Sequence, residues 1–135
     1  MRIAISTGGA DAPGLNAVIR AAVLSATSRG WEVLGICRGY YGLLGEDDII
    51  PMTRETVRGI GHLGGTILRT TNRGNPFAFP TRLPDGSYVE VDRSAELLEN
   101  VARLGIEAIV TIGGDGSLAI AQRLFELGVQ IVGVP

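Results

Sequence analysis

The sequence lacks lysine and is poor in cysteine and histidine, and each shortage excludes a class of site. All twelve basic residues are arginine, so a phosphate-binding loop of the G-x-x-x-x-G-K-S/T type is absent. The single Cys37 excludes an intramolecular disulfide and a multi-cysteine zinc site. Because His62 is the one histidine, most metal centres and catalytic triads are excluded as well.

Long apolar runs are also missing. No segment approaches the ~20 residues that a membrane-spanning helix needs. The amino terminus turns polar and glycine-rich after Ser6, unlike a signal peptide. The net charge of −2 argues against general electrostatic capture of nucleic acid. We therefore expect a cytoplasmic protein with neither a membrane nor a nucleic acid as its partner.

Apolar residues and glycine are abundant. Apolar residues make up 45% and charged residues 19%, which excludes a disordered chain, and 135 residues correspond to one domain or a part of one. The 20 glycines are about twice the usual ~7% share. Most stand at the ends of apolar runs, where tight turns are needed. Arginines beside such turns suit phosphate, because the guanidinium binds oxyanions through paired hydrogen bonds.

The spacing of apolar residues and glycines predicts strands that alternate with helices. Strands are expected at residues 2–6, 32–37, 88–91, 108–112 and 130–134. Helices are expected at 15–29, 53–60, 94–104 and 118–127. Residues 38–52 and 64–84 are expected to be irregular, with a hairpin turn at Asp85-Gly86. In the first helix, Leu15, Val18, Ala22 and Ser25 are expected to share one face.

This order predicts an α/β fold, a Rossmann-like three-layer βαβ sandwich with a mainly parallel sheet. In such folds ligands bind at the carboxyl ends of the strands. Two glycine-rich turns, residues 7–14 and 113–117, each follow a strand and precede a helix. These turns are therefore the first candidates for a binding site.

The turn at 113–117 has the chemistry of a phosphate site. Its glycines let the backbone approach a phosphate, and the following helix offers free N–H groups. Asp115 at its tip would repel a polyphosphate unless a divalent cation such as Mg²⁺ lies between them. The alternative is an ordinary β-turn in which Asp115-Gly116 supplies only turn chemistry.

The turn at 7–14 is similar but does not match the dinucleotide pattern G-x-G-x-x-G, because Gly8 and Gly9 are adjacent. If this turn binds no ligand, Asp11 and Asn16 are explained as caps of the helix that follows it. A third cluster runs from Gly64-Gly65-Thr66 to Arg73. Its arginines either neutralise charge on a transferring phosphoryl group or are ordinary solvated loop arginines.

Taken together, these motifs resemble the amino-terminal part of the 6-phosphofructokinase family across essentially the whole chain. The matching segments are Thr7–Arg20, Gly39-Tyr40, Gly64-Gly65-Thr66 and Ile112–Ser117. Residues 72–80 are similar to the bacterial branch whose members use ATP or pyrophosphate. The resemblance implies Mg²⁺-dependent transfer of a terminal phosphoryl group to O1 of fructose 6-phosphate, a glycolytic reaction that gives fructose 1,6-bisphosphate.

The resemblance also implies a donor site. Its expected residues are Gly9, Ala10, Tyr40, Arg73, Gly74, Gly114, Asp115, Gly116 and Ser117. Among them Asp115 matches the magnesium-associated aspartate, and Arg73 and Gly116 are the catalytic candidates. Asn72 is the alternative alignment for Arg73. The family has glycine where this chain has Ala10, and a small residue is commoner where it has Arg69.

ATP is the expected donor. Many pyrophosphate users in the family carry aspartate at the position of Gly116, where its charge would repel the α-phosphate of ATP. The alternatives are a pyrophosphate-dependent enzyme, and a lipid or NAD kinase, which shares the Gly-Gly-Asp-Gly turn but not the other motifs.

The acceptor side of the family's site is not in the chain. The Thr-Ile-Asp-Asn-Asp motif that holds the family's base is absent, and so are the arginines that bind the sugar phosphate. We expect residues 1–135 to be a donor-binding amino-terminal domain, cut before that motif and inactive alone. The resemblance implies a homo-oligomer for the full-length enzyme, and a non-catalytic nucleotide-binding module is the remaining alternative.

Overall fold

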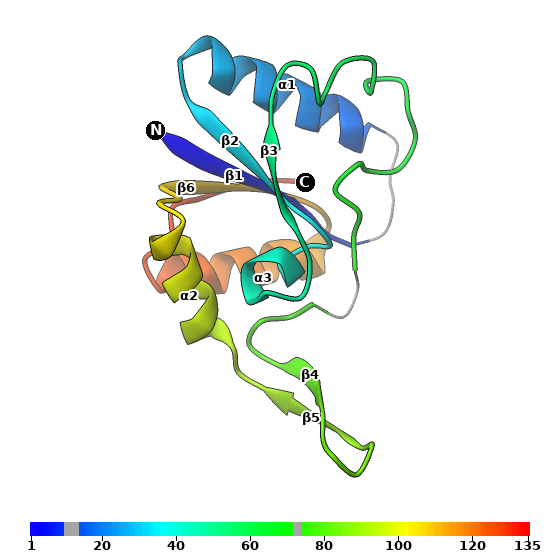
Figure 1. Ribbon diagram of the computed structural model, residues 1–135, viewed down its shortest axis with the longest axis vertical. Coiled ribbons are helices and arrows are strands. Elements are labelled where there is room, and N and C mark those ends of the chain that lie inside the picture. Colours follow the sequence, from blue (N-terminus) through cyan, green and yellow to red (C-terminus); the bar gives the residue numbers. More distant parts are fainter. Residues whose placement is uncertain (10–13, 72–73) are drawn as a thin grey trace.

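A five-stranded sheet with the strand order β3-β2-β1-β6-β7 lies at the centre of the computed structural model (Figure 1). The structure describes residues 1–9, 14–71 and 74–135. The strands of this sheet are β1 (Arg2–Thr7), β2 (Glu32–Ile36), β3 (Ile49–Met52), β6 (Ala108–Ile112) and β7 (Ile131–Val134). All neighbours pair in parallel except β3, which is antiparallel to β2. The sheet is thus mainly parallel, as predicted.

Helices cover both faces of this sheet. Helix α1 (Leu15–Ser28) lies on one face, and α2 (Ser94–Arg103) and α3 (Asp115–Glu126) lie on the other (Figure 1). Each face has its own apolar core, because successive residues of a strand point to opposite sides. In β1, Ile3 and Ile5 belong to the α1 side and Ala4 to the other. The three-layer α/β architecture is confirmed.

Within residues 1–9, 14–71 and 74–135, no helix combines the length and the apolar run that crossing a bilayer requires.

Residues 38–52 are more ordered than the sequence predicts. They contain a short 3₁₀ helix, η1 (Tyr41–Leu44), and the edge strand β3. The glycines and Pro51 that suggested a loop are compatible with both. Pro51 lies on a strand that pairs on only one side, where its missing N–H does no harm.

The helix predicted at 53–60 is wrong, because the structure has only turns there. Thr53 and Thr56 exchange backbone-to-hydroxyl hydrogen bonds of 2.8 and 3.3 Å, as a helix start would. Gly59, however, has a φ of +73°, which ends any right-handed turn. Val57 and Ile60 are nevertheless buried in the core on the α1 side.

Within residues 64–84, those that the structure describes are irregular except near the end. There β4 (Phe79–Arg82) pairs antiparallel with β5 (Tyr88–Val91). The predicted turn at Asp85-Gly86 joins these two strands, with Gly86 at a φ of +88°. The hairpin projects away from the layered body (Figure 1).

The buried face of α1 differs from the predicted one. The structure buries Leu15, Ile19, Val23 and Ala26, whereas Ser25 is exposed. Both sets have helical spacing, and the buried set carries the larger apolar surface. Burial of apolar area decides the rotation of a helix against a sheet.

Asn16 does not cap α1, so the alternative prediction of a helix cap is wrong for this residue. Gly14 is the N-cap residue, and among the described residues no side chain caps this helix end. The buried Asn16 amide instead donates to the carbonyls of Leu63 and Gly64, each at 3.3 Å. Its Oδ1 accepts the Ile67 N–H at 2.8 Å. One side chain therefore fixes the course of residues 63–67.

We predict that Asn16→Ala lowers the free energy of unfolding by about 1–3 kcal/mol, because it leaves buried backbone groups unpaired. Urea denaturation followed by the fluorescence of Trp31 measures this change. Ser28→Ala, an exposed change on the same helix, is the control and should cost little. Equal stability of the two variants would contradict the role given to Asn16.

Candidate functional site

The two glycine-rich turns meet at the carboxyl ends of β1 and β6. These strands are parallel neighbours, with Thr7 opposite Ile112. The chain runs from β1 towards β2 on one side and from β6 to β7 on the other. The order of connection therefore reverses between β1 and β6, which is where open α/β sheets bind ligands.

Close packing of the two turns explains two of the glycines. A Cβ on Gly8 would lie 2.3 Å from Ser117 Oγ, and one on Gly113 would lie 2.8 Å from the Gly8 carbonyl oxygen. The clash at Gly113 is with backbone, so this position requires glycine, whereas a Cβ on Gly8 would force the Ser117 hydroxyl to move. The N–H of Gly8 also donates to the Ile112 carbonyl at 2.9 Å.

Gly114 and Gly116 differ, because a Cβ at either position would meet nothing within 4 Å in the described structure. Both are exposed. These two glycines leave open the space in front of α3. Glycine at such a position lets a ligand approach the protein backbone closely, and it is not needed here for packing within the protein.

Helix α3 begins three residues earlier than predicted, at Asp115, with Gly114 as N-cap. No side chain of residues 1–9, 14–71 or 74–135 caps this end. The first intrahelical bond runs from the Leu118 N–H to the Gly114 carbonyl at 3.0 Å. The N–H groups of the first turn and the positive end of the helix dipole therefore face an open surface, which suits an anion.

A cavity of about 420 Å³ opens beside this helix end. Its lining residues are Ser6, Gly8, Gly9, Gly39, Tyr40, Thr71, Gly74, Asn75, Thr111, Gly116, Ser117, Ala119, Ile120 and Arg123. Of the predicted site residues, Gly9, Tyr40, Gly74, Gly116 and Ser117 line it. Gly114 and Asp115 do not, and they adjoin it in the chain. Ala10, Asn72 and Arg73 lie outside the described residues.

Tyr40 lines the cavity, and a hydrogen bond to β6 holds its side chain in place. Its ring is 4% exposed, and its hydroxyl shares a 3.0 Å hydrogen bond with Thr111 Oγ1. Burial raises the pKa of this phenol, so it stays neutral. The preceding Gly39 carbonyl accepts from Ser6 Oγ at 3.0 Å. The Gly39-Tyr40 motif is thereby fixed to β1 and β6.

Arg123 is a cavity residue that the sequence analysis missed. It follows Gly116 by seven residues, so it lies on the same face of α3 as Gly116 and Ile120. Its guanidinium carbon lies 3.8 Å from the centroid of the Phe77 ring. The helical spacing from Gly116 was a usable signal, but only once α3 was known to begin at Asp115.

The Gly64-Gly65-Thr66 cluster supports the site rather than lining the cavity. Thr66 Oγ1 lies 3.0 Å from Thr7 Oγ1 at the end of β1. The Arg69 carbonyl also accepts from Thr7 Oγ1, at 3.0 Å. The Arg69 guanidinium pairs with Asp47 at 3.1 Å, so it is not an unpaired solvated arginine.

The described residues contain no cluster of three or more histidine, cysteine, aspartate or glutamate side chains that could hold a metal. Asp115 is exposed at the start of α3, in front of the open glycines. One carboxylate of this kind cannot enclose an ion. It can complete a Mg²⁺ site whose other ligands are phosphate oxygens and water.

Comparison with known proteins identifies what the fold and these turns are similar to. Residues 2–135 match the family model described as Phosphofructokinase. A relative from Chloroflexus aggregans, named ATP-dependent 6-phosphofructokinase, is 47% identical over 99% of this chain. The chain spans 36% of that relative's length.

Solved structures agree on the fold. A phosphofructokinase from Saccharomyces cerevisiae superposes with a TM-score of 0.73 at 31% identity, covering 98% of this chain and 19% of its own. A pyrophosphate-dependent phosphofructokinase from Marinobacter aquaeolei gives 0.68 at 17% identity, covering 99% and 33%. The second likeness shows the fold alone.

We predict that Gly113→Ala lowers the free energy of unfolding by about 1–3 kcal/mol, because the new methyl group collides with backbone. Gly116→Ala is the matched control, since its methyl group enters open space. That variant should be as stable as the parent, or more stable by up to about 1 kcal/mol. Thermal unfolding of both variants tests the prediction, and a larger loss for Gly116→Ala would refute it.

Proposed function

The chain belongs to the phosphofructokinase family, and on that premise we propose that residues 1–135 form the donor-binding part of an ATP-dependent 6-phosphofructokinase. The observation that carries the proposal is the uncapped start of α3 beside a cavity of about 420 Å³. It combines an anion site with space for the rest of a nucleotide. In the complete enzyme the reaction is transfer of the γ-phosphoryl group of ATP to fructose 6-phosphate, a step of glycolysis.

The donor phosphates bind at the amino end of α3. Gly114, Gly116 and Ser117 contribute backbone N–H groups there, and the missing Cβ atoms of the two glycines let the phosphates come close. Gly116 acts in catalysis through this backbone, which stabilises charge on the transferring group. Gly9 lines the cavity from the segment after β1, and Ala10, which lies outside the described residues, is proposed to belong to the same donor site.

The nucleoside part of ATP occupies the cavity between Tyr40 and α3. The cavity's lining residues include Tyr40 and Ile120, which offer apolar surface, and Arg123, which adds a cation. Gly74 lines the cavity, and Arg73, its neighbour in the sequence, is proposed to act on the transferring phosphoryl group. An arginine there would supply positive charge as charge develops on the phosphoryl oxygens.

The residues present fit a magnesium ion bound together with the donor. Asp115 is exposed, and no hydrogen bond or ion pair to its carboxylate is found in the described part of the chain. It would hold Mg²⁺ on the donor phosphates and balance their charge against its own. When bound, the ion would neutralise negative charge on the phosphate oxygens during the transfer.

The acceptor side of the reaction requires groups beyond these residues. The family's Thr-Ile-Asp-Asn-Asp motif is not in the sequence, and the chain covers 36% of its Chloroflexus relative. We therefore assign donor binding to residues 1–135, and fructose 6-phosphate binding to the rest of a longer enzyme. That enzyme is proposed to be a cytoplasmic homo-oligomer.

ATP is favoured over pyrophosphate as the donor. The Chloroflexus relative is named ATP-dependent. Gly116 adds no side chain and no charge in front of α3, where a Cβ would meet nothing within 4 Å. The longer triphosphate can therefore lie along the helix start.

Asp115→Asn should weaken the binding of Mg²⁺–ATP by about tenfold, because losing one charged ligand removes about 1.4 kcal/mol or more. The melting temperature should stay unchanged, since the carboxylate is exposed. Calorimetric titration of the 135-residue chain with ATP, with and without Mg²⁺, measures the effect.

Glu126→Gln is the control for this change, because Glu126 is exposed at the opposite end of α3. It should bind Mg²⁺–ATP like the parent. If Asp115→Asn instead lowers the melting temperature and leaves the affinity intact, Asp115 is a structural turn residue.

Gly116→Asp should weaken ATP binding by at least about tenfold and affect pyrophosphate less, because the new carboxylate would repel the α-phosphate. Parallel titrations with Mg²⁺–ATP and Mg²⁺–pyrophosphate compare the two donors. A parent chain that binds pyrophosphate more tightly than ATP would show that the donor assignment is wrong.

A further inference from the structure

We propose that Asp47 is a positioning residue that holds Thr71 and Gly74, one wall of the cavity, through Arg38 and Arg69. The proposal rests on the proposed function, because it gives this wall a role in binding the donor. Asp47 does not line the cavity itself. Its influence would pass through two chains of contacts that both end at Gly74.

The Asp47 carboxylate is the point where these contacts converge. Its side chain is 11% exposed. Oδ2 accepts from Arg38 Nε at 2.5 Å, and both oxygens accept from an Arg69 terminal nitrogen, at 3.1 and 3.3 Å. Oδ1 also accepts the Asp48 N–H at 2.7 Å. The Asp48 N–H and the Arg38 guanidinium lower the pKa of Asp47, so the carboxylate remains ionised at neutral pH.

The two arginines that bind this carboxylate have unusual backbones. Arg38 has a φ of +52° and Arg69 a φ of +62°, and they are the two non-glycine residues with positive φ in the described chain. Such conformations are unfavourable for residues with a Cβ and persist where the surroundings impose them. Both guanidinium groups bind Asp47, and each arginine is shortly followed by a residue that lines the cavity, Gly39 after Arg38 and Thr71 after Arg69.

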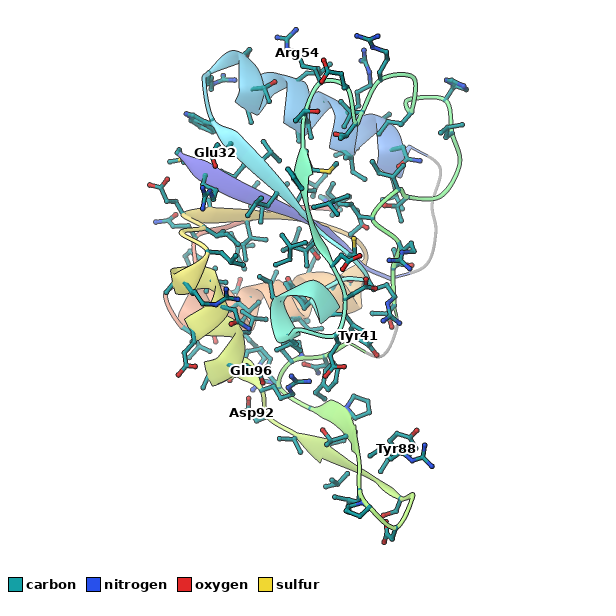
Figure 2. The ribbon with its side chains drawn as sticks, viewed as in Figure 1. Glu32, Tyr41, Arg54, Tyr88, Asp92 and Glu96 are labelled. Carbon is teal, nitrogen blue, oxygen red and sulfur yellow. The ribbon has the colours of Figure 1, made fainter. Side chains whose placement is uncertain are left out.

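The first chain of contacts runs through an aromatic ring. The Arg38 guanidinium carbon lies 4.6 Å from the centroid of Tyr41. A Cβ on Gly74 would lie 2.8 Å from Tyr41 Cε1, so the Tyr41 ring packs directly against Gly74. Figure 2 shows Tyr41 between the layered body and the projecting hairpin. Arg38 thus sets the position of the ring, and the ring limits the position of Gly74.

The second chain of contacts runs through the loop that contains Arg69. The Arg38 N–H donates to the Leu68 carbonyl at 2.8 Å, which joins the two arginine segments. Two residues after Arg69, Thr71 packs towards the cavity. Its Cγ2 would lie 2.9 Å from a Cβ on Gly74 and 3.5 Å from one on Gly39. The backbone at Arg69 therefore determines where Thr71 meets Gly74.

The test compares Asp47→Asn with Glu32→Gln. Glu32 forms an exposed ion pair with Arg2 at 2.7 Å, at the beginning of β2 and far from Tyr41 (Figure 2). Hydrogen exchange of the amides of residues 36–44 and 66–71 is measured without ligand. Asp47→Asn should raise exchange in both segments by about tenfold, because local opening becomes easier. Glu32→Gln should leave them unchanged.

Titration with Mg²⁺–ATP is the second measurement. Asp47→Asn should raise the dissociation constant by about tenfold, because displacement of a site wall weakens binding without removing a contact. Arg69→Gly should act in the same direction. Glycine adopts a φ of +62° without strain, so this variant removes the whole side chain, guanidinium included, without adding backbone strain. Arg69→Lys, which keeps the charge, should recover part of the affinity.

Unchanged exchange in Asp47→Asn and Arg69→Gly would overturn the proposal. Faster exchange with the affinity of the parent would also overturn it, since the contacts would then be structural only. If Asp47→Asn does not fold, Arg69→Gly and Arg69→Lys decide. Failure of the parent chain to bind Mg²⁺–ATP would instead refute the proposed function and with it the donor role, while the exchange data still report whether Asp47 holds the wall.

Discussion

The close packing of two strand-to-helix turns is the constraint on which the rest of the site depends. Gly8 and Ser117 approach so closely that a Cβ on Gly8 would lie 2.3 Å from the Ser117 hydroxyl oxygen. This contact fixes the start of α3 against the end of β1. Gly114 and Gly116 then face open space, and the N–H groups of the first helical turn stay available. The glycines are therefore of two kinds, those that let the protein pack against itself and those that leave room for a ligand.

Side chains rather than backbone packing hold the opposite side of the cavity. The ring of Tyr41 lies between the guanidinium of Arg38 and the ring of Phe79, whose centroid is 5.2 Å away. The guanidinium carbon of Arg93 lies over the Phe79 ring, 4.7 Å from its centroid. The neighbouring acidic residues Glu46 and Asp47 pair with Arg93 and Arg38.

These contacts form a closed ring of interactions, called the circuit below, that contains two arginines, two aromatic rings and two adjacent carboxylates. The circuit joins η1, the turn after it and the base of the β4–β5 hairpin. The same Asp47 carboxylate also binds Arg69, whose φ is +62°. The left-handed backbone there would suit glycine, and Arg69 adopts it while its guanidinium binds Asp47.

The sequence by itself determined the α/β class, the mainly parallel sheet and the positions of the two glycine-rich turns, because these depend on local patterns. The apolar run Ala108–Ile112 and the glycines after it indicate a buried strand followed by a helix without any knowledge of neighbours. Only the tertiary structure decided the contacts of Asn16, Asp47 and Arg123. Asn16 binds backbone 47 to 51 residues away, and Asp47 pairs with Arg69 across 22 residues. Arg123 joins the cavity because α3 begins at Asp115. Such contacts follow from distances between segments remote in sequence, and residue patterns along one segment carry no information about those distances.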